Sequence, residues 1–263
     1  MAAFEPGSYW EDRLKANYDE RGVGDIGLST AYNSYLYAVR RRVFQRQLRR
    51  LPLAPSMTRV LDVGSGTGVY VQEWQDWGAA DITGCDITQV AVDRLAVRFP
   101  GARFIRLDIG SPASDELRGE QFDVISAFDV LFHIVDDDDY RRAIERIAAL
   151  VVPGGWFLYS DNLVERESRI SHYVSRTESD ILAALRSCGF TVRRRTPMFV
   201  LMNDPVRSRS RVLRRWFSSI YGIAGRSEAW GRMAGRLLYP VELAATRLIT
   251  RGPSTEILVC QRV

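Results

Sequence analysis

A glycine-rich turn near residue 65 has the spacing that says most about chemistry in this chain. An apolar run that contains Asp62 leads into Gly64, Ser65, Gly66 and, two residues later, Gly68. Glycines at alternate positions let the backbone approach a ligand closely and adopt φ values that a side chain would resist. The spacing is G-x-G-x-G, whereas the dinucleotide fingerprint is G-x-G-x-x-G. Asp62 would repel a pyrophosphate but attract an ammonium or sulfonium group, so the turn favours a cationic nucleoside over NAD.

Three later segments also end in a carboxylate. Asp86, Asp108 and Asp129 each follow a short run of residues with the composition of a strand. Asp86 lies about 20 residues beyond the glycines, the distance at which an acid binds ribose hydroxyls in nucleotide-binding folds. Because the carboxyl ends of parallel strands meet at one edge of a sheet, we expect these acids to lie at the same edge.

The glycine turn and the acids that follow it resemble the class I S-adenosylmethionine-dependent methyltransferases, from about residue 55 to residue 200 and again at the C-terminus. In that family the acid of the turn lies by the methionine moiety, the acid after the second strand binds the ribose, and the acid after the third strand meets the adenine amino group. By position these are Asp62, Asp86 and Asp108. The resemblance implies S-adenosyl-L-methionine as cofactor and S-adenosyl-L-homocysteine as product. It implies further cofactor contacts near these acids, in the turn, after the fourth strand and in the N-terminal segment, namely Tyr9, Trp10, Gly64, Ser65, Gly66, Gly68, Ile87, Ile109, Phe128, Asp129 and His133.

The order of the apolar segments predicts an α/β fold. Strands and helices alternate from residue 58 to residue 200, which indicates a parallel sheet covered on both faces, and residues 256–262 read as a closing strand. The resemblance implies a seven-stranded, mostly parallel, doubly wound sheet with an antiparallel last strand, and it extends to the Pro-Gly-Gly sequence at 153–155. We therefore divide the chain into an N-terminal helical cap (1–52), a cofactor-binding Rossmann-like core (53–202 and 254–263) and a helical insertion before the last strand (203–253).

The insertion, residues 203–253, is the chief departure from the family pattern, in which a short hairpin usually joins the last two strands. Ten arginines against three carboxylates give it a net charge of +7, which leaves about −3 for the rest of a chain whose total is +4. Its apolar residues recur at helical spacing and predict two basic amphipathic helices. Such helices can wall the acceptor pocket, form a homodimer contact or lie on an anionic membrane surface. Nucleic acid is disfavoured as a partner because no recognised binding module accompanies the arginines.

His133 and His172 are the two histidines of the chain and its candidate catalytic bases. Methyl transfer from a sulfonium is an in-line displacement that depends mainly on alignment and on exclusion of water, but a hydroxyl acceptor also gains from a base near the methyl group. Histidine has a suitable unperturbed pKa for that role. His133 follows the fourth expected strand and His172 follows the fifth. A packing role stays open for both residues, as does a cofactor-side role for His133.

Aromatic residues are frequent in two N-terminal helices, which we expect near 8–20 and 31–51. Tyr9 and Trp10 lie in the first helix, and a second group spans residues 32–37. In the resembling family such segments often close over the cofactor and the substrate. Aromatic faces suit a sulfonium cation electrostatically, but helical aromatic residues also pack in cores. Both interpretations therefore stay open.

No metal site is expected. The acid run from Asp136 to Asp139 reads as the N-terminal cap of a helix, with a magnesium site as the alternative. Cys85, Cys188 and Cys260 lack the paired spacing of a zinc site and read as buried free thiols.

Length and composition agree with one sizeable domain, since the chain has 263 residues, of which 46% are hydrophobic. The early acidic residues and the absence of any run of about 20 apolar residues predict a cytoplasmic protein. We expect methyl transfer to a small-molecule acceptor, an apolar or aromatic biosynthetic intermediate, with a hydroxyl favoured over carbon or nitrogen. The alternatives are non-methylating chemistry with the same cofactor, and a cofactor-binding regulatory protein that docks on a membrane or a partner.

Overall fold

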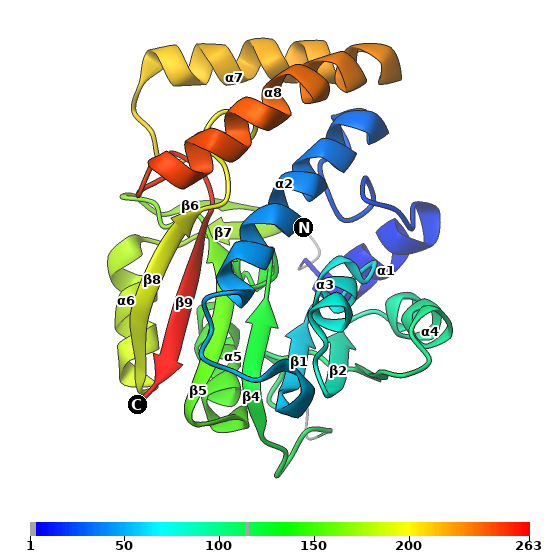
Figure 1. The fold of residues 1–263 in the computed structure, drawn as a ribbon, viewed down its shortest axis with the longest axis vertical. Helices are drawn as coiled ribbons and strands as arrows, with labels where there is room; N and C mark the ends of the chain where they lie inside the picture. Colours follow the sequence, from blue (N-terminus) through cyan, green and yellow to red (C-terminus); the bar gives the residue numbers. More distant parts are fainter. Residues whose placement is uncertain (1–3, 114–115) are drawn as a thin grey trace.

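Seven strands form one sheet at the centre of the computed structural model, which describes residues 4–113 and 116–263 (Figure 1). The strand order is β3-β2-β1-β4-β5-β9-β8, and neighbouring strands are parallel except where β9 pairs with β5 and β8. The expected mostly parallel sheet with an antiparallel last strand is therefore confirmed. The strands of this sheet are β1 (Arg59–Val63), β2 (Asp81–Asp86), β3 (Arg103–Arg106), β4 (Phe122–Ala127), β5 (Val151–Asp161), β8 (Phe190–Pro197) and β9 (Glu256–Arg262).

Helices cover both faces of the sheet, so each face is closed by an apolar cluster. The first cluster includes Phe44 and Trp74, and the second, on the other face, includes Ile144 and Phe157. No helix in the described ranges is long and apolar enough to cross a membrane. The first cluster draws on α2 (Thr30–Leu48), α3 (Val69–Trp77), α4 (Gln89–Arg98), α7 (Arg211–Ala224) and α8 (Glu228–Leu248), and the second on α5 (Asp137–Leu150) and α6 (Glu178–Ser187).

The strand order reverses between β1 and β4, which is the point where open α/β sheets bind their ligands. Asp62 lies in β1 and Asp86 ends β2, while Asp108 and Asp129 follow β3 and β4. Because these strands are parallel, their carboxyl ends lie at one edge. The topology thus brings the acids together, as the sequence predicts.

Local capping explains where several helices begin. The helices expected near 8–20 and 31–51 are α1 (Pro6–Ala16) and α2, and the Ser29 hydroxyl caps α2. Asp136 caps α5, because its carboxylate accepts hydrogen bonds from the N–H groups of Asp138 and Asp139 at 2.8 and 2.9 Å. The interpretation of the acid run as a helix cap is therefore confirmed.

Two local features were not anticipated from the sequence. The Pro-Gly-Gly sequence at 153–155 forms a bulge inside β5 rather than a separate turn, since Phe122 pairs with Val151 while Val124 pairs with Trp156. After β5, β6 (Ser168–Ile170) and β7 (Tyr173–Ser175) form a short antiparallel hairpin whose turn contains His172.

The two helices expected in the insertion are α7 and α8, and α8 packs closely on α2 (Figure 1). A Cβ atom on Gly235 would lie only 2.1 Å from the ring of Tyr35, so the contact requires glycine there. The carboxylate of Glu228 accepts hydrogen bonds from the first two N–H groups of α2 at 2.9 and 2.8 Å. Glu242 is fully buried and accepts two backbone N–H groups of the segment after β8. These contacts fix which side of α8 faces the protein.

Both ends of the insertion are tied to one buried carboxylate, that of Glu256 at the start of β9. Arg207, before α7, donates to its Oε1 atom, which also accepts the N–H of Gly252, after α8. Arg195 in β8 donates to the other oxygen at 2.9 Å. Glu178 pairs with both arginines, at 2.5 Å from Arg195 and 3.2 Å from Arg207. Every charge in the cluster therefore has an opposite charge beside it.

Candidate functional site

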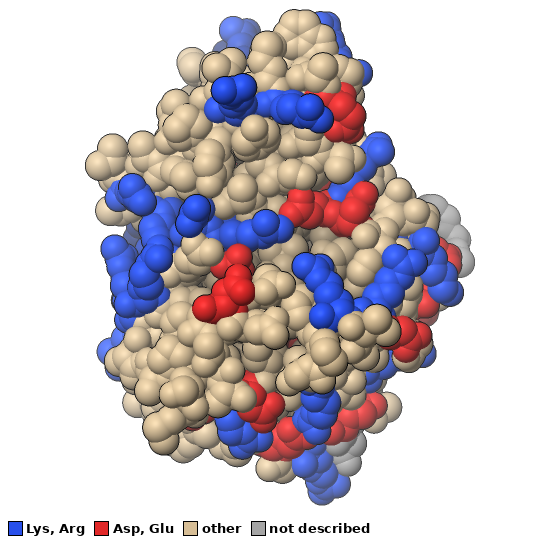
Figure 2. Space-filling model, turned by 45° about the vertical axis from the view of Figure 1, so that its right-hand side comes forward, with Lys and Arg blue, Asp and Glu red and all other residues tan. Residues whose placement is uncertain are grey.

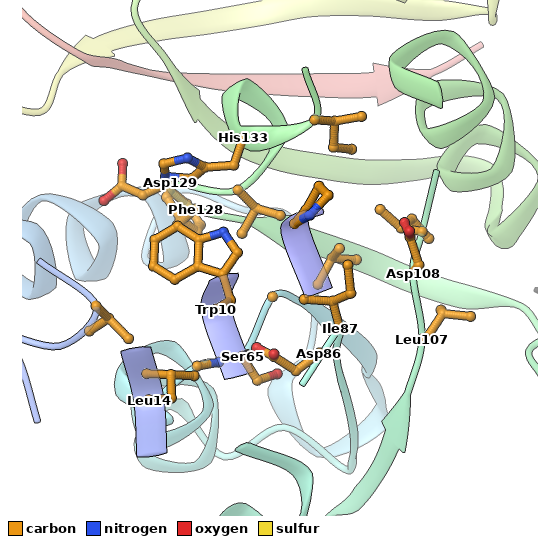
Figure 3. Close-up of a pocket in the computed structure, with 18 of the residues that line it drawn as sticks. Trp10, Leu14, Ser65, Asp86, Ile87, Leu107, Asp108, Phe128, Asp129 and His133 are labelled. Carbon is orange, nitrogen blue, oxygen red and sulfur yellow. Dashed lines mark hydrogen bonds between the residues drawn. The ribbon is translucent and has the colours of Figure 1, made fainter. Parts of the chain in front are cut away.

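A cavity of about 370 Å³ lies beyond the carboxyl ends of the central strands (Figure 3). The glycine turn after β1 forms one wall, the loops after β2, β3 and β4 form others, and α1 covers one side. Carboxylates of Asp86, Asp108 and Asp129 are among the few charged groups in a mostly apolar lining. A cavity of this size and composition suits a small organic ligand with a few polar contacts.

The glycine turn approaches the loop after β4 as closely as a backbone can. Gly64 and Gly66 have φ angles of 71° and 52°, which glycine adopts without strain. A Cβ atom on Gly64 would lie 2.2 Å from a methyl carbon of Val130, so no side chain fits there. The Ser65 hydroxyl donates to the carbonyl of Asp62 at 3.0 Å and holds the turn closed. The turn therefore presents backbone, rather than side chains, to the cavity.

Asp86 connects this turn to the end of β2. One carboxylate oxygen accepts the N–H of Gly66 at 2.8 Å, and the other accepts the N–H and hydroxyl of Thr88 at 2.9 and 2.7 Å. Burial raises the pKa of Asp86, and these hydrogen bonds oppose that effect. Asp108 is oriented by the N–H of Gly110 at 3.0 Å. Carboxylate oxygens can accept hydrogen bonds from hydroxyl or amino groups of a ligand.

Asp62 lies beneath the glycine turn, inside the sheet. Its Oδ1 atom accepts a hydrogen bond from Ser126 at 2.6 Å, and Ser126 accepts one from Trp74 at 2.9 Å. Its Oδ2 atom is buried without a hydrogen-bond partner in the described structure. Burial raises the pKa of Asp62 to about 7. A buried carboxylate with an unsatisfied oxygen favours a cation nearby, because a positive charge would offset its lost hydration.

Asp129 forms a half-buried ion pair at the end of β4. Its backbone has φ of 58°, which is unusual for a residue with a side chain. Its carboxylate accepts hydrogen bonds from Arg40 at 2.8 Å and from the Ser160 hydroxyl at 2.9 Å, and its N–H donates to that hydroxyl at 2.7 Å. The Arg40 guanidinium also lies over the rings of Tyr37 and Phe199. These contacts fix the carboxylate in the cavity wall.

His133 has a defined tautomer. Its Nδ1 atom lies 2.8 Å from the carbonyl oxygen of His172, and because a carbonyl only accepts, Nδ1 must carry the proton. Burial lowers the pKa of His133 to about 4, so the ring is neutral near pH 7 and Nε2 is a hydrogen-bond acceptor. Trp10 meets this ring edge-on, with 4.8 Å between the ring centroids. The site thus contains an oriented, uncharged imidazole.

The helix α1 is attached over the cavity by contacts at several points. Trp10 lies between His133 and the strand ends (Figure 3), and the guanidinium of Arg13 lies 5.0 Å from the centre of its ring. Glu11 accepts the N–H of Gln89 at 2.8 Å and thereby caps α4. The functional interpretation of the first aromatic stretch fits Trp10, since this side chain lines the cavity instead of the core.

Most of the site residues expected from the sequence do line the cavity. Four do not. Asp62 lies beneath it, and Gly68 caps α3 with φ of 81° and packs against α4. The other two, Tyr9 and His172, lie outside the lining and stack on each other, with 5.6 Å between ring centroids. Those that line it are Trp10, Gly64, Ser65, Gly66, Asp86, Ile87, Asp108, Ile109, Phe128, Asp129 and His133.

Sequence reasoning missed the lining residues that come from elsewhere in the chain. Tyr37 lies in the second aromatic stretch, for which the sequence left open a packing role and a role at the site. Arg40, which does not line the cavity but holds Asp129 in place, gave no local signal because its partner is 89 positions away in the sequence. No lining residue comes from 203–253, so the structure does not support the idea that the insertion walls this cavity. The other lining residues that were missed include Phe4, Glu5, Pro6, Leu14, Val23, Thr67, Val69 and Tyr70.

No metal site is apparent in the described ranges, where no group of three or more His, Cys, Asp or Glu side chains could hold an ion. Cys85 and Cys260 are buried free thiols, whereas Cys188 is only half-buried.

The antiparallel strand β9 between β5 and β8, and a cavity walled by the glycine turn and strand-end acids, define a class I S-adenosylmethionine-dependent methyltransferase. The model of the methyltransferase-domain family matches residues 35–193, and the chain belongs to this family. The expected fold class, enzyme class and cofactor are therefore confirmed at the level of the family.

Individual relatives are more distant and match only part of the chain. Ubiquinone biosynthesis O-methyltransferase of Bordetella avium is 33% identical over 106 residues, which cover 39% of this chain and 42% of that protein. Ribosomal protein L11 methyltransferase of Symbiobacterium thermophilum is 29% identical over 114 residues, or 43% and 35% of the two chains. This chain thus spans less than half the length of either relative.

The fold similarity extends over the whole chain. The crystal structure of magnesium protoporphyrin IX methyltransferase from Synechocystis, with bound S-adenosylmethionine, superposes with a TM-score of 0.61 at 17% identity and covers 100% of both chains. The names of these three proteins refer to unlike acceptors. The comparisons therefore establish family and fold, and the acceptor has to be argued from the site.

Proposed function

We propose that this protein transfers a methyl group from S-adenosylmethionine to a hydroxyl group of a small, largely apolar molecule. The observation that carries the proposal is the neutral, oriented imidazole of His133 in the same cavity as the glycine turn and Asp86. When bound, the cofactor supplies an electrophilic methyl group on a sulfonium. The chain has to bind it, exclude water and align the acceptor.

The cavity has groups suited to each part of the cofactor. Asp86 can accept hydrogen bonds from the ribose hydroxyls, and Asp108 from the adenine amino group. The unsatisfied oxygen of Asp62 beneath the turn favours the ammonium and sulfonium charges. The Tyr70 hydroxyl, in the cavity lining, is likewise buried without a partner in the described structure. These unsatisfied groups are what a polar, cationic ligand would complete.

In this proposal His133 removes the proton of the acceptor. The acceptor hydroxyl would donate a hydrogen bond to Nε2. Its proton would pass to Nε2 while the methyl carbon leaves the sulfur of the cofactor and bonds to the acceptor oxygen, with S-adenosylhomocysteine as the leaving group. An imidazole whose pKa is about 4 is a weak base, so it would not ionise the hydroxyl beforehand. Methylation makes the hydroxyl proton far more acidic, and a weak base then suffices.

An apolar acceptor is suggested by the lining near His133. Val130, Ile134 and Phe128 line this part of the cavity, and such side chains favour hydrocarbon or aromatic surface. The name of the Bordetella relative, which refers to O-methylation in ubiquinone biosynthesis, also supports a hydroxyl on such a molecule. Methylation of carbon or nitrogen, and non-methylating use of the cofactor, are the competing functions.

An acceptor screen distinguishes these functions. The protein with S-adenosylmethionine would be incubated with phenols and catechols and, in parallel, with anilines of the same shape, and both products followed by mass spectrometry. We expect S-adenosylhomocysteine and a methyl ether to appear together. Methylated anilines without ethers would instead show N-methylation. A rearranged substrate without S-adenosylhomocysteine would show non-methylating chemistry. The expected cytoplasmic location stays a prediction, and a homodimer contact stays one of the alternatives for the insertion; this screen addresses neither.

A further inference from the structure

The outward side of α8 carries a continuous apolar stripe. Its members are separated by three or four residues, the spacing that places side chains on one side of a helix. All are exposed, and the exposed fractions of Leu237 and Leu248 are 66% and 82%. A row of large apolar side chains on a surface commonly marks an interaction site. The apolar stripe consists of Trp230, Met233, Leu237, Val241, Ala244 and Leu248.

The stripe faces outward because the opposite side of α8 is firmly packed. Gly235 admits Tyr35 of α2, Glu242 is buried in hydrogen bonds to the segment after β8, and Glu228 caps α2. Rotating the helix to bury the stripe would break all of these contacts. The exposed stripe is therefore a consequence of the fold rather than of a loosely attached helix.

Arginines flank the stripe on one side. Arg232, Arg236 and Arg247 each come one position before a stripe residue, so all three lie on the same flank. At the C-terminus of α2, Arg46 donates to Thr246 of α8 at 2.8 Å, and Arg49 and Arg50 follow it, exposed.

The arginines at the C-terminal ends of α2 and α8 lie close enough to repel one another. Burial lowers the pKa of Arg46, and the charges of Arg247, Arg50 and Arg49 lower it further. Its Nε atom is buried without a hydrogen-bond partner in the described structure. Within the part of the chain that the structure describes, no carboxylate forms an ion pair with these four arginines or with Arg232 and Arg236. Figure 2 shows basic side chains gathered at the left of its view. Such a surface favours an anionic partner.

The carboxylates of the insertion do not neutralise this face. Glu228 and Glu242 are held by backbone N–H groups, and Asp204 is exposed but lies before α7 rather than on α8. A second copy placed on this face would therefore set arginines against arginines. Nucleic acid would match the arginines but would leave the apolar stripe against phosphates. An anionic lipid bilayer matches both features, since it has phosphates at its surface and hydrocarbon beneath.

We propose that α8, together with the C-terminal arginines of α2, docks on an anionic membrane surface. The apolar stripe enters the boundary between headgroups and acyl chains, and the flanking arginines meet lipid phosphates. The helix lies in the plane of the membrane and does not cross it. This docking goes beyond the proposed methyl transfer and does not depend on it.

Vesicle flotation tests the docking surface. The protein would be mixed with vesicles of phosphatidylcholine alone or with a third of phosphatidylglycerol. We expect binding only to the anionic vesicles. Leu237→Glu, which places a charge in the centre of the stripe at an exposed position, should weaken binding at least tenfold. Replacing Arg232, Arg236 and Arg247 together by glutamine should weaken it about 100-fold, since each basic residue near an anionic surface contributes about 1 kcal/mol, or about fivefold.

A matched control variant removes three exposed arginines that lie outside α2 and the insertion, Arg141, Arg166 and Arg186, and should bind vesicles as the unchanged protein does. Unchanged thermal unfolding and unchanged S-adenosylhomocysteine affinity would show that the variants are folded.

Absence of binding to anionic vesicles, or an equal loss in the control variant, would overturn the proposal. So would a lipid-free dimer that Leu237→Glu dissociates, because the stripe would then bind a second copy. Anionic oligonucleotides that bind the unchanged protein and Leu237→Glu equally well, while vesicles do not bind, would point to nucleic acid instead.

Discussion

The strand-end edge around Asp86 and the outward face of α8 differ in where their polar and charged groups find partners. At the strand ends, Asp86, Asp108 and Asp129 are each oriented by N–H or guanidinium groups of the same chain. On α8, the flanking arginines have no ion pair in the described structure, and the stripe between them is open to solvent. One region is preorganised by the protein itself, and the other leaves its charges and apolar surface to be completed from outside.

This difference determines what each region can select. A preorganised cavity pays little conformational cost on binding and distinguishes ligands by the position of single atoms. A basic, apolar helix face recognises only the chemistry of a surface, namely its charge and its hydrocarbon interior. We therefore expect substitutions at the strand ends to act through one hydrogen bond or one charge, and substitutions on α8 to act in proportion to the number of residues changed.

The largest expected effect is on the free energy of unfolding, and it comes from the buried ion-pair cluster around Glu256 that attaches the insertion to the core. Glu256→Gln leaves Arg195 and Arg207 with less negative charge in a buried cluster, and unpairing buried charges typically costs about 3–5 kcal/mol. Because Glu178 still pairs with both arginines, we expect the lower end, about 3 kcal/mol, in the free energy of unfolding measured with urea.

The matched control for this prediction is Glu165→Gln, which breaks the exposed pair with Arg209. It should change the free energy of unfolding by less than about 1 kcal/mol. Equal losses in the two variants would mean that the insertion is not attached through the buried cluster. The folded fraction of Glu256→Gln should still bind S-adenosylhomocysteine, since the cluster does not line the cavity.

The next effect is the loss of cofactor affinity in Asp86→Ala. This change removes the acceptor for ribose hydroxyls and also frees the N–H of Gly66. Hydrogen bonds to a charged group contribute about 1.5–3 kcal/mol each, so we expect the dissociation constant of S-adenosylhomocysteine to rise by on the order of 10²-fold or more in calorimetry. Asp93→Ala, an exposed acid on α4, serves as the control and should leave the affinity unchanged. Retained affinity in Asp86→Ala would contradict the assignment of the cavity.

A somewhat smaller effect is expected for His133→Gln, measured at saturating S-adenosylmethionine with an acceptor from the screen. Loss of the base should lower kcat about 10²-fold, the low end for general base catalysis, because the imidazole is a weak base. His172→Gln should have little effect, since its ring does not line the cavity.

The pH profile of kcat gives a second test of His133. Burial holds the pKa of this residue at about 4, below its usual 6.5, so the neutral form persists as the pH falls and is lost only near pH 4. We expect kcat to change little between pH 8 and pH 5.5. A decrease centred on pH 6.5 would show that the ring is not buried as described, or that another group acts as the base.

The strand-end edge could be predicted from the sequence because each of its features is local. The turn around Gly64 and the acid Asp86 are each recognised within a few residues, and the parallel topology then brings them together. The ion pair between Arg40 and Asp129 could not be predicted, because it joins a helix to a strand end across 89 positions. The same holds for Phe4 and Leu14, which line the cavity because the N-terminal segment folds over it, held in part by the hydrogen bond from Gln89 of α4 to Glu11.

For the insertion, the presence of two helices could be predicted, but not which side of α8 is buried. Its helical periodicity and basic charge are visible in the sequence, and α7 and α8 form where they are expected. The sequence did not indicate which side of α8 would be buried, because large apolar residues usually face the core. Here the small residue Gly235 and the buried carboxylate of Glu242 face α2 and β8, and this reversal leaves Leu237 exposed.

The smallest expected effect is the pH dependence of cofactor affinity. It separates the two regions most cleanly, because it can be measured on the unchanged protein. Burial raises the pKa of Asp62 to about 7, and a cation bound nearby favours the ionised carboxylate. Affinity for S-adenosylhomocysteine, which keeps its ammonium, should therefore fall about tenfold from pH 8 to pH 6 as Asp62 becomes protonated. Calorimetry on Asp62→Asn should show weaker binding without this dependence, and 5′-methylthioadenosine, which has no ammonium, should bind the unchanged protein equally at both pH values. Binding to anionic vesicles through arginines, which stay charged, should not change over this range. If both kinds of binding weakened together at low pH, the cause would be a change in the folded protein, and the contrast between a preorganised cavity and a surface that selects by charge and apolar area would not hold.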